Sequence, residues 1–175
     1  MRVVAGRLGG RRINAPRGRA TRPTSDRVRE ALFSLLGPVE GASVLDLFAG
    51  SGALGIEALS RGAATVDFVE TDARAVAAIR ANLDALGLER ARVHRRDALG
   101  YLRAGAGPYD LIFADPPYSC APRLAGPLSC ALLTGLSEDA LIVIESDKRH
   151  PLALELPLVL ERFYGDTRIA VHRGT

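Results

Sequence analysis

Residues 44–55 read Val44-Leu45-Asp46-Leu47-Phe48-Ala49-Gly50-Ser51-Gly52-Ala53-Leu54-Gly55, an apolar run that leads into the pattern G-x-G-x-x-G. This arrangement is typical of a strand that turns sharply into a helix in a nucleotide-binding βαβ unit. The glycines let a ligand approach the backbone, and the free N–H groups at the helix start can bind it. The residues expected to line a cofactor site are therefore Phe48, Gly50, Ser51 and Gly52. A tight turn without a ligand is the alternative.

Short apolar runs alternate with helical patterns on both sides of this loop. The predicted strands are 43–48, 65–70, 92–95, 111–114 and 141–145, and the predicted helices are 53–61 and 73–86. Apolar strands joined by helices indicate a mostly parallel sheet that is covered on both faces. The tail differs, because 158–163 and 168–172 flank a tight turn and are typical of an antiparallel hairpin. We expect an α/β fold of the Rossmann-like type.

Carboxylates follow the predicted strands and help to define the cofactor. Asp46 would repel a pyrophosphate over the loop but attract an ammonium group, which favours S-adenosylmethionine over a dinucleotide; capping of the loop amides is the alternative. Glu70 ends the second strand, where an acid can hydrogen-bond the ribose hydroxyls, unless it is merely solvated there. Asp97 can accept from the adenine amino group with Ala98 packing nearby, although Asp97 is also a typical helix cap.

A tetrapeptide, Asp115-Pro116-Pro117-Tyr118, follows the apolar run Tyr109–Ala114. In open α/β sheets, ligands bind beyond the carboxyl ends of the strands, so this segment is expected beside the glycine loop. An oxygen of Asp115 and the carbonyl of Pro116 can each accept one hydrogen of an exocyclic amine, which aims the nitrogen at a sulfonium methyl group. Tyr118 can stack on an extruded base. We predict catalytic roles for Asp115, Pro116 and Tyr118; a rigid loop is the alternative.

Basic residues gather at the N-terminus. Residues 1–30 hold nine arginines and two acidic residues, a net charge of +7, whereas the whole chain carries +3 and the remainder therefore −4. A basic segment on an acidic body indicates contact with a polyanion, of which nucleic acid is the commonest. Arg22, Arg27 and Arg29 are the predicted phosphate contacts. Salt-bridged surface arginines, or a segment that closes over the cofactor, are the alternatives.

The N-terminal segment is expected to form a hairpin and a helix. Residues 2–5 and 11–14 can pair around Gly9-Gly10, and Thr24-Ser25 can cap the helix that follows. Its apolar stripe consists of Val28, Ala31, Leu32, Leu35 and Leu36. The arginines lie off this stripe, so we expect the helix to dock on the body and to present them outward.

Two segments resemble the RsmD-type 16S rRNA guanine-N2 methyltransferases, within the class I methyltransferases. They are Arg22-Pro23-Thr24-Ser25-Asp26-Arg27-Val28-Arg29-Glu30-Ala31-Leu32-Phe33 and Asp46-Leu47-Phe48-Ala49-Gly50-Ser51-Gly52-Ala53-Leu54-Gly55-Ile56-Glu57-Ala58-Leu59. The resemblance implies a seven-stranded sheet, S-adenosylmethionine as methyl donor, and a guanine (position 966) of 16S rRNA in a partly assembled 30S particle as target. We expect a basic N-terminal arm and helix over 1–37, followed by a methyltransferase domain over 38–175.

Other functions stay open at this point. An enzyme that methylates adenine N6 in DNA or a protein amide, and an RNA-binding assembly factor without catalysis, share these features. An oxidoreductase is disfavoured by Asp46 and by the lack of a His/Lys pair for hydride transfer. Cys120 and Cys130 match no zinc or redox motif, so no metal is expected. No apolar run reaches the length of a membrane span, and we expect a cytoplasmic monomer.

Overall fold

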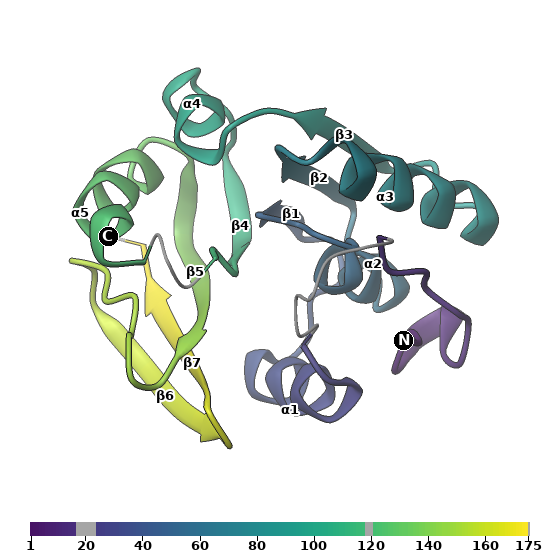
Figure 1. Ribbon diagram of the computed structural model, residues 1–175, viewed down its shortest axis with the longest axis horizontal. Helices are drawn as coiled ribbons and strands as arrows, with labels where there is room; N and C mark the ends of the chain where they lie inside the picture. Colours follow the sequence, from purple (N-terminus) through teal and green to yellow (C-terminus); the bar gives the residue numbers. More distant parts are fainter. Residues whose placement is uncertain (17–23, 118–120, 175) are drawn as a thin grey trace.

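The computed structural model describes residues 1–16, 24–117 and 121–174, with the side chains of 121 and 122 left out. One sheet organises this part of the chain (Figure 1), in the order β3-β2-β1-β4-β5-β7-β6. Its strands are β1 (Ser43–Leu47), β2 (Thr65–Glu70), β3 (Ala91–Arg95), β4 (Tyr109–Ala114), β5 (Leu136–Asp147), β6 (Leu158–Tyr164) and β7 (Thr167–Arg173). The first five strands run parallel to one another, and β7 runs antiparallel to both β5 and β6. The predicted parallel sheet with an antiparallel C-terminal hairpin is confirmed.

Helices cover both faces of this sheet. They are α1 (Asp26–Leu36), α2 (Ala53–Ser60), α3 (Ala73–Leu86), α4 (Ala98–Arg103) and α5 (Ala121–Leu132), with a short 3-10 helix, η1 (Gly6–Leu8). Side chains alternate between the faces along each strand. Val44, Phe68 and Phe113 therefore pack with α1, α2 and α3, whereas Leu45 and Ile112 pack with α4 and α5 on the opposite face. None of the described helices has the length and apolar character needed to cross a bilayer.

The glycine loop joins β1 to α2 through two left-handed glycines. Gly50 and Gly52 have φ angles of 55° and 77°, a region that glycine adopts without steric cost. The third glycine serves packing, since a Cβ at Gly55 would lie 2.4 Å from a ring carbon of Phe68 on β2. The helix can approach the sheet this closely only because residue 55 has no side chain.

The N-terminal segment is docked on the body. Residues Arg2 and Arg12 form an antiparallel bridge, but η1 lies between them, so the connection is longer than the expected turn at Gly9-Gly10. The buried carboxylate of Glu57 accepts from the backbone amides of Val4 and Ala5, at 2.7 and 3.0 Å. Because α2 supplies this anchor, the segment is fixed beside the glycine loop.

Candidate active site

Four acidic side chains lie at the carboxyl ends of four neighbouring strands. They are Asp46 on β1, Glu70 on β2, Asp115 just after β4, and Glu145 on β5. Asp46 pairs in register with Phe68 and Phe113, and Phe113 pairs with Val143. Glu70, Asp115 and Glu145 each lie two residues beyond one of these partners, so all four acids share the face covered by α1, α2 and α3.

Asp46 is buried, with 3% of its surface exposed, and caps the start of α2. Its Oδ2 accepts from the amide of Gly55 at 2.9 Å. Burial raises the pKa of Asp46 to about 8; the Gly55 hydrogen bond opposes this shift and the nearby charge of Glu70 adds to it. The capping interpretation is confirmed, whereas ammonium binding by the same carboxylate stays a prediction.

Glu70 fixes the glycine loop from the neighbouring strand. Its Oε2 accepts from the amide of Gly50 at 2.9 Å, and its Oε1 accepts from the amides of Thr71 and Asp72. Only 6% of the residue is exposed, so the interpretation as a merely solvated strand end is wrong. Because a carboxylate oxygen has two lone pairs, Oε2 can accept a further hydrogen bond.

The loop residues between these acids carry local strain. Phe48 adopts a φ of 58°, a conformation that costs a non-glycine residue roughly 1–3 kcal/mol and is common at ligand sites. The carbonyl of Ser51 accepts from the side-chain amide of Asn82 at 3.2 Å, and its hydroxyl lies 3.5 Å from the sulfur of Met1. The N-terminus and α3 thus contact the loop that was predicted to bind the cofactor.

Asp97 is exposed and caps α4, where it accepts from the amide of Gly100 at 2.8 Å. The capping interpretation is confirmed for this residue. Ala98, next to it, is buried. The predicted contacts of both residues with an adenine ring stay predictions.

Asp115 and Pro116 offer unused hydrogen-bond acceptors at the end of β4. Among the described residues, neither the Asp115 carboxylate nor the Pro116 carbonyl accepts a hydrogen bond. Burial raises the pKa of Asp115 well above its usual range, and the neighbouring carboxylates of Glu145 and Asp46 raise it further. Tyr118, the third predicted catalytic residue, lies outside the described residues.

Glu145 is a site residue that the sequence interpretation missed. It is 5% exposed and accepts from the Thr24 hydroxyl at 2.5 Å. Burial raises its pKa, although the Thr24 hydrogen bond and the charge of Arg29 oppose the shift. The sequence did hold a signal, because Glu145 directly follows the apolar run 141–144, although β5 itself continues to Asp147.

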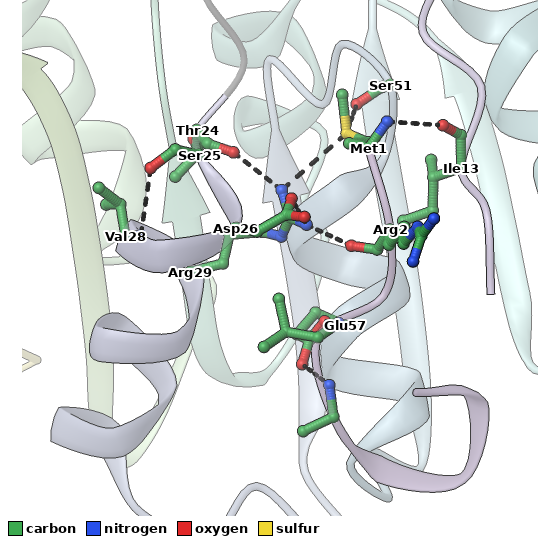
Figure 2. Close-up of polar contacts among 12 residues, drawn as sticks. Met1, Arg2, Ile13, Thr24, Ser25, Asp26, Val28, Arg29, Ser51 and Glu57 are labelled. Atoms are coloured by element: carbon green, nitrogen blue, oxygen red, sulfur yellow. Dashed lines mark hydrogen bonds and ion pairs between the residues drawn. The ribbon is translucent and has the colours of Figure 1, made fainter. Parts of the chain in front are cut away.

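Arg29 is wholly buried, so the expectation that α1 presents it outward is wrong. Figure 2 shows its guanidinium group between the N-terminus and the first turn of α1. It donates to the carbonyl of Thr24 at 2.8 Å, to the carbonyl of Arg2, and to Asp26 Oδ1 at 2.8 Å. The N-terminal segment packs over this side of the helix, which helical periodicity alone does not reveal. Arg27 is exposed, and Arg22 lies outside the described residues.

Comparisons with known proteins place the chain in a family. The family model described as "Conserved hypothetical protein 95" matches residues 1–173. The chain belongs to this family. The chain is 41% identical to the "Putative rRNA methyltransferase YlbH" of Bacillus subtilis, over 99% of this chain and 98% of the relative. It is 39% identical to the "Ribosomal RNA small subunit methyltransferase D" of Escherichia coli K12, over 87% of this chain and 77% of the relative.

Solved structures agree with this assignment. The "Putative methyltransferase yhhF from Escherichia coli" matches with a TM-score of 0.87 and 34% identity, over 99% of this chain and 97% of that one. The structure described as "Crystal structure of SMU.776, a putative methyltransferase complexed with SAH" shares the fold, with a TM-score of 0.65 and 19% identity, over 85% of this chain and 48% of that one. The predicted Rossmann-like methyltransferase fold is confirmed, as is the resemblance to RsmD-type methyltransferases. This family member is a methyltransferase.

Proposed function

We propose that this chain transfers the methyl group of S-adenosylmethionine to the exocyclic N2 of a guanine in 16S rRNA. The observation that carries the proposal is the pair of acceptors at Asp115 and Pro116, which have no hydrogen-bond donor among the described residues and lie at the end of β4, the strand beside β1 and its glycine loop. The relatives named as small-subunit rRNA methyltransferases support rRNA as the substrate. The target atom, N2 of guanine, is suggested by the resemblance of the N-terminal segment to the RsmD-type enzymes.

The charges of the site fit this cofactor. Asp46 is buried without an ion-pair partner among the described residues, and Glu70, Asp115 and Glu145 share its face of the sheet. S-adenosylmethionine carries an ammonium and a sulfonium group, which would offset part of this negative charge. Asp46 would hold the ammonium and Glu70 the ribose hydroxyls, with the adenine ring beside Asp97 and Ala98. The rest of the cofactor site would be lined by Phe48, Gly50, Ser51 and Gly52.

The proposed reaction is a direct methyl transfer. The bound cofactor supplies a methyl group on a sulfonium sulfur, which leaves as a neutral thioether when the methyl carbon bonds to N2. Asp115 and the Pro116 carbonyl each accept one hydrogen of the amine and so orient its nitrogen, an effect of position rather than of covalent catalysis. The nitrogen then loses one proton, to Asp115 or to water. Tyr118 would stack on the extruded base.

The docked N-terminal segment would provide the contact with rRNA. Residues 1–30 carry a net charge of +7, and Met1 at the start of this segment contacts the glycine loop at Ser51. Phosphate contacts by arginines supply much of the affinity for nucleic acid. Arg27 and Arg22 remain the proposed phosphate contacts. We propose a monomer that acts on a partly assembled 30S particle, where rRNA is already folded and can be recognised by shape.

The decisive experiment offers several substrates with a labelled methyl donor. Naked 16S rRNA, partly assembled 30S particles, DNA and protein are incubated with the enzyme, and the modified nucleoside or residue is then identified. We expect N2-methylguanosine at a single position, formed best in the particles. Labelled N6-methyladenine in DNA, or label in protein alone, would overturn the proposed substrate.

Asp46 gives this proposal a pH-dependent signature. An ammonium group beside Asp46 should lower its pKa from about 8, so that a carboxyl that is mostly protonated at pH 7 ionises when the cofactor binds. We expect cofactor binding at pH 7 to release up to about one proton, measured by calorimetry in two buffers of different ionisation enthalpy. Asp46→Asn should bind more weakly and release fewer protons. Equal proton release by the variant would contradict the ammonium role.

The same pKa shift predicts how Asp46 affects stability. The pKa of Asp46 in the folded state is raised above its ordinary value of 3.8. Asp46 therefore makes its full contribution to folding stability below pH 3.8, and this contribution is lost as the pH rises through about 8. Each pKa unit corresponds to about 1.4 kcal/mol. In urea unfolding, Asp46→Asn should therefore gain stability relative to the wild type between pH 5 and pH 8.5.

A further inference from the structure

Glu145 lies beside Asp115 and has an unused carboxylate oxygen. Ala114 pairs with Ile144 across the parallel strands β4 and β5, so the two acids that follow them lie at equivalent positions. Their charges interact. One oxygen of Glu145 accepts from Thr24, and the other has no hydrogen-bond partner among the described residues. No salt bridge holds Glu145 within that part of the chain.

The free oxygen of Glu145 is open to a donor on a ligand. Among the described residues, the fully buried side-chain atoms without a partner are Arg29 Nε, Ser146 Oγ and His172 Nε2, so this oxygen stays accessible although the residue is only 5% exposed. Arg29 is the nearby cation that stabilises the charged form of Glu145, but its two Nη atoms donate to Thr24, Arg2 and Asp26, and its Nε makes no hydrogen bond within the described residues. The free oxygen of Glu145 is therefore available to a substrate bound at Asp115.

The hydrogen-bonding edge of the base decides what such an acceptor recognises. Guanine carries an N1–H beside its N2 amine, so a second carboxylate next to Asp115 finds a donor there. Adenine carries a lone pair on N1 beside its N6 amine, so the same carboxylate meets another acceptor. Discrimination by an unpaired buried polar group is strong, because the wrong partner leaves the group without a hydrogen bond.

We propose that Glu145 is a specificity-determining residue that accepts the N1 hydrogen of the target guanine and excludes adenine. This inference rests on the proposed guanine-N2 activity. Asp115 and the Pro116 carbonyl then accept the hydrogens of the amine, while Glu145 accepts the hydrogen on the neighbouring ring atom, N1. Thr24, which lies just before α1, fixes the Glu145 carboxylate by donating a hydrogen bond to its other oxygen.

The test replaces the target guanine in reconstituted particles with 2-aminopurine, which keeps the amine but presents a lone pair on N1. We expect the wild type to prefer guanine by about 100-fold or more in kcat/KM. Glu145→Gln has nearly the same shape, and its amide can donate to N1. Its preference for guanine should fall at least about 10-fold, because one donor now satisfies the lone pair.

Glu138→Gln is the matched control, since Glu138 is exposed at the opposite end of the same strand. It should keep the wild-type preference. Glu145→Gln with a wild-type preference, even at a reduced rate, would show that Glu145 serves only the fold. If that variant does not fold, the wild type decides alone, because equal methylation of guanine and 2-aminopurine overturns the inference. A wild type that forms no N2-methylguanosine overturns the proposed function and this inference with it.

Discussion

Replacing Asp115 with alanine is expected to lower the rate of methyl transfer by at least about 100-fold, the usual cost of misplacing a reacting group. The reason is that the amine would keep only the Pro116 carbonyl as acceptor, and its nitrogen would no longer be aimed at the methyl carbon. Affinity for the cofactor should change little, because Asp46 and Glu70 hold the loop without Asp115. Single-turnover kinetics and calorimetry with S-adenosylmethionine measure the two quantities separately.

Two further variants define what Asp115 contributes. Asp115→Asn keeps one acceptor oxygen without the charge, so it should retain more activity than the alanine variant if orientation dominates. Asp84→Ala removes an exposed acid from α3 and should turn over like the wild type. An Asp115→Ala enzyme with wild-type turnover would show that the tetrapeptide is only a rigid loop.

The sheet could be predicted because its determinants are local. Thr65–Glu70 is a strand with the predicted bounds, since its β-branched and aromatic residues Thr65, Val66, Phe68 and Val69 favour a strand over this short segment. The glycine loop is equally local, because left-handed backbone at Gly50 and Gly52 requires glycine whatever packs around it. For the same reason, Asp46 and Glu70 could be placed at the strand ends before any contact was known.

The helix α5 (Ala121–Leu132) was not predicted. It contains Pro127 and Gly126, which are poor helix formers, so local propensity argues against it. Burial of Leu128 and Leu132 against the sheet outweighs that preference. Tertiary packing, which one segment of sequence does not reveal, therefore decides this element.

Some residues of the candidate site could likewise be predicted from local sequence, whereas others depend on tertiary structure. The acids of the first, second and fourth strands were identified from their positions in the sequence. Glu145 was missed because its importance depends on β5 lying beside β4, a consequence of strand order. Thr24 reaches it from 121 residues away along the chain, so no local pattern could have joined the two.

Replacing Arg29 with methionine is expected to lower the free energy of unfolding by about 2–6 kcal/mol, because two backbone carbonyls lose their donor and each unsatisfied acceptor costs about 1–3 kcal/mol. Its guanidinium donates to the carbonyls of Thr24 and Arg2 and to Asp26, with none of its surface exposed. Methionine fills similar space but leaves both carbonyls without a donor. Urea unfolding followed by circular dichroism measures the loss. The free energy of unfolding of Arg29→Lys should fall between those of the wild type and Arg29→Met.

Arg27→Met is the matched control, because Arg27 is exposed on the same helix. Its stability should stay within about 0.5 kcal/mol of the wild type, while the salt dependence of its RNA affinity should lose about one counterion. Arg29→Met, assayed where it is still folded, should keep the wild-type salt slope. The opposite pattern, an Arg29 variant of normal stability with a reduced slope, would mean that this arginine leaves its buried position to contact phosphate. The docked N-terminal segment would then be a conformation that RNA displaces.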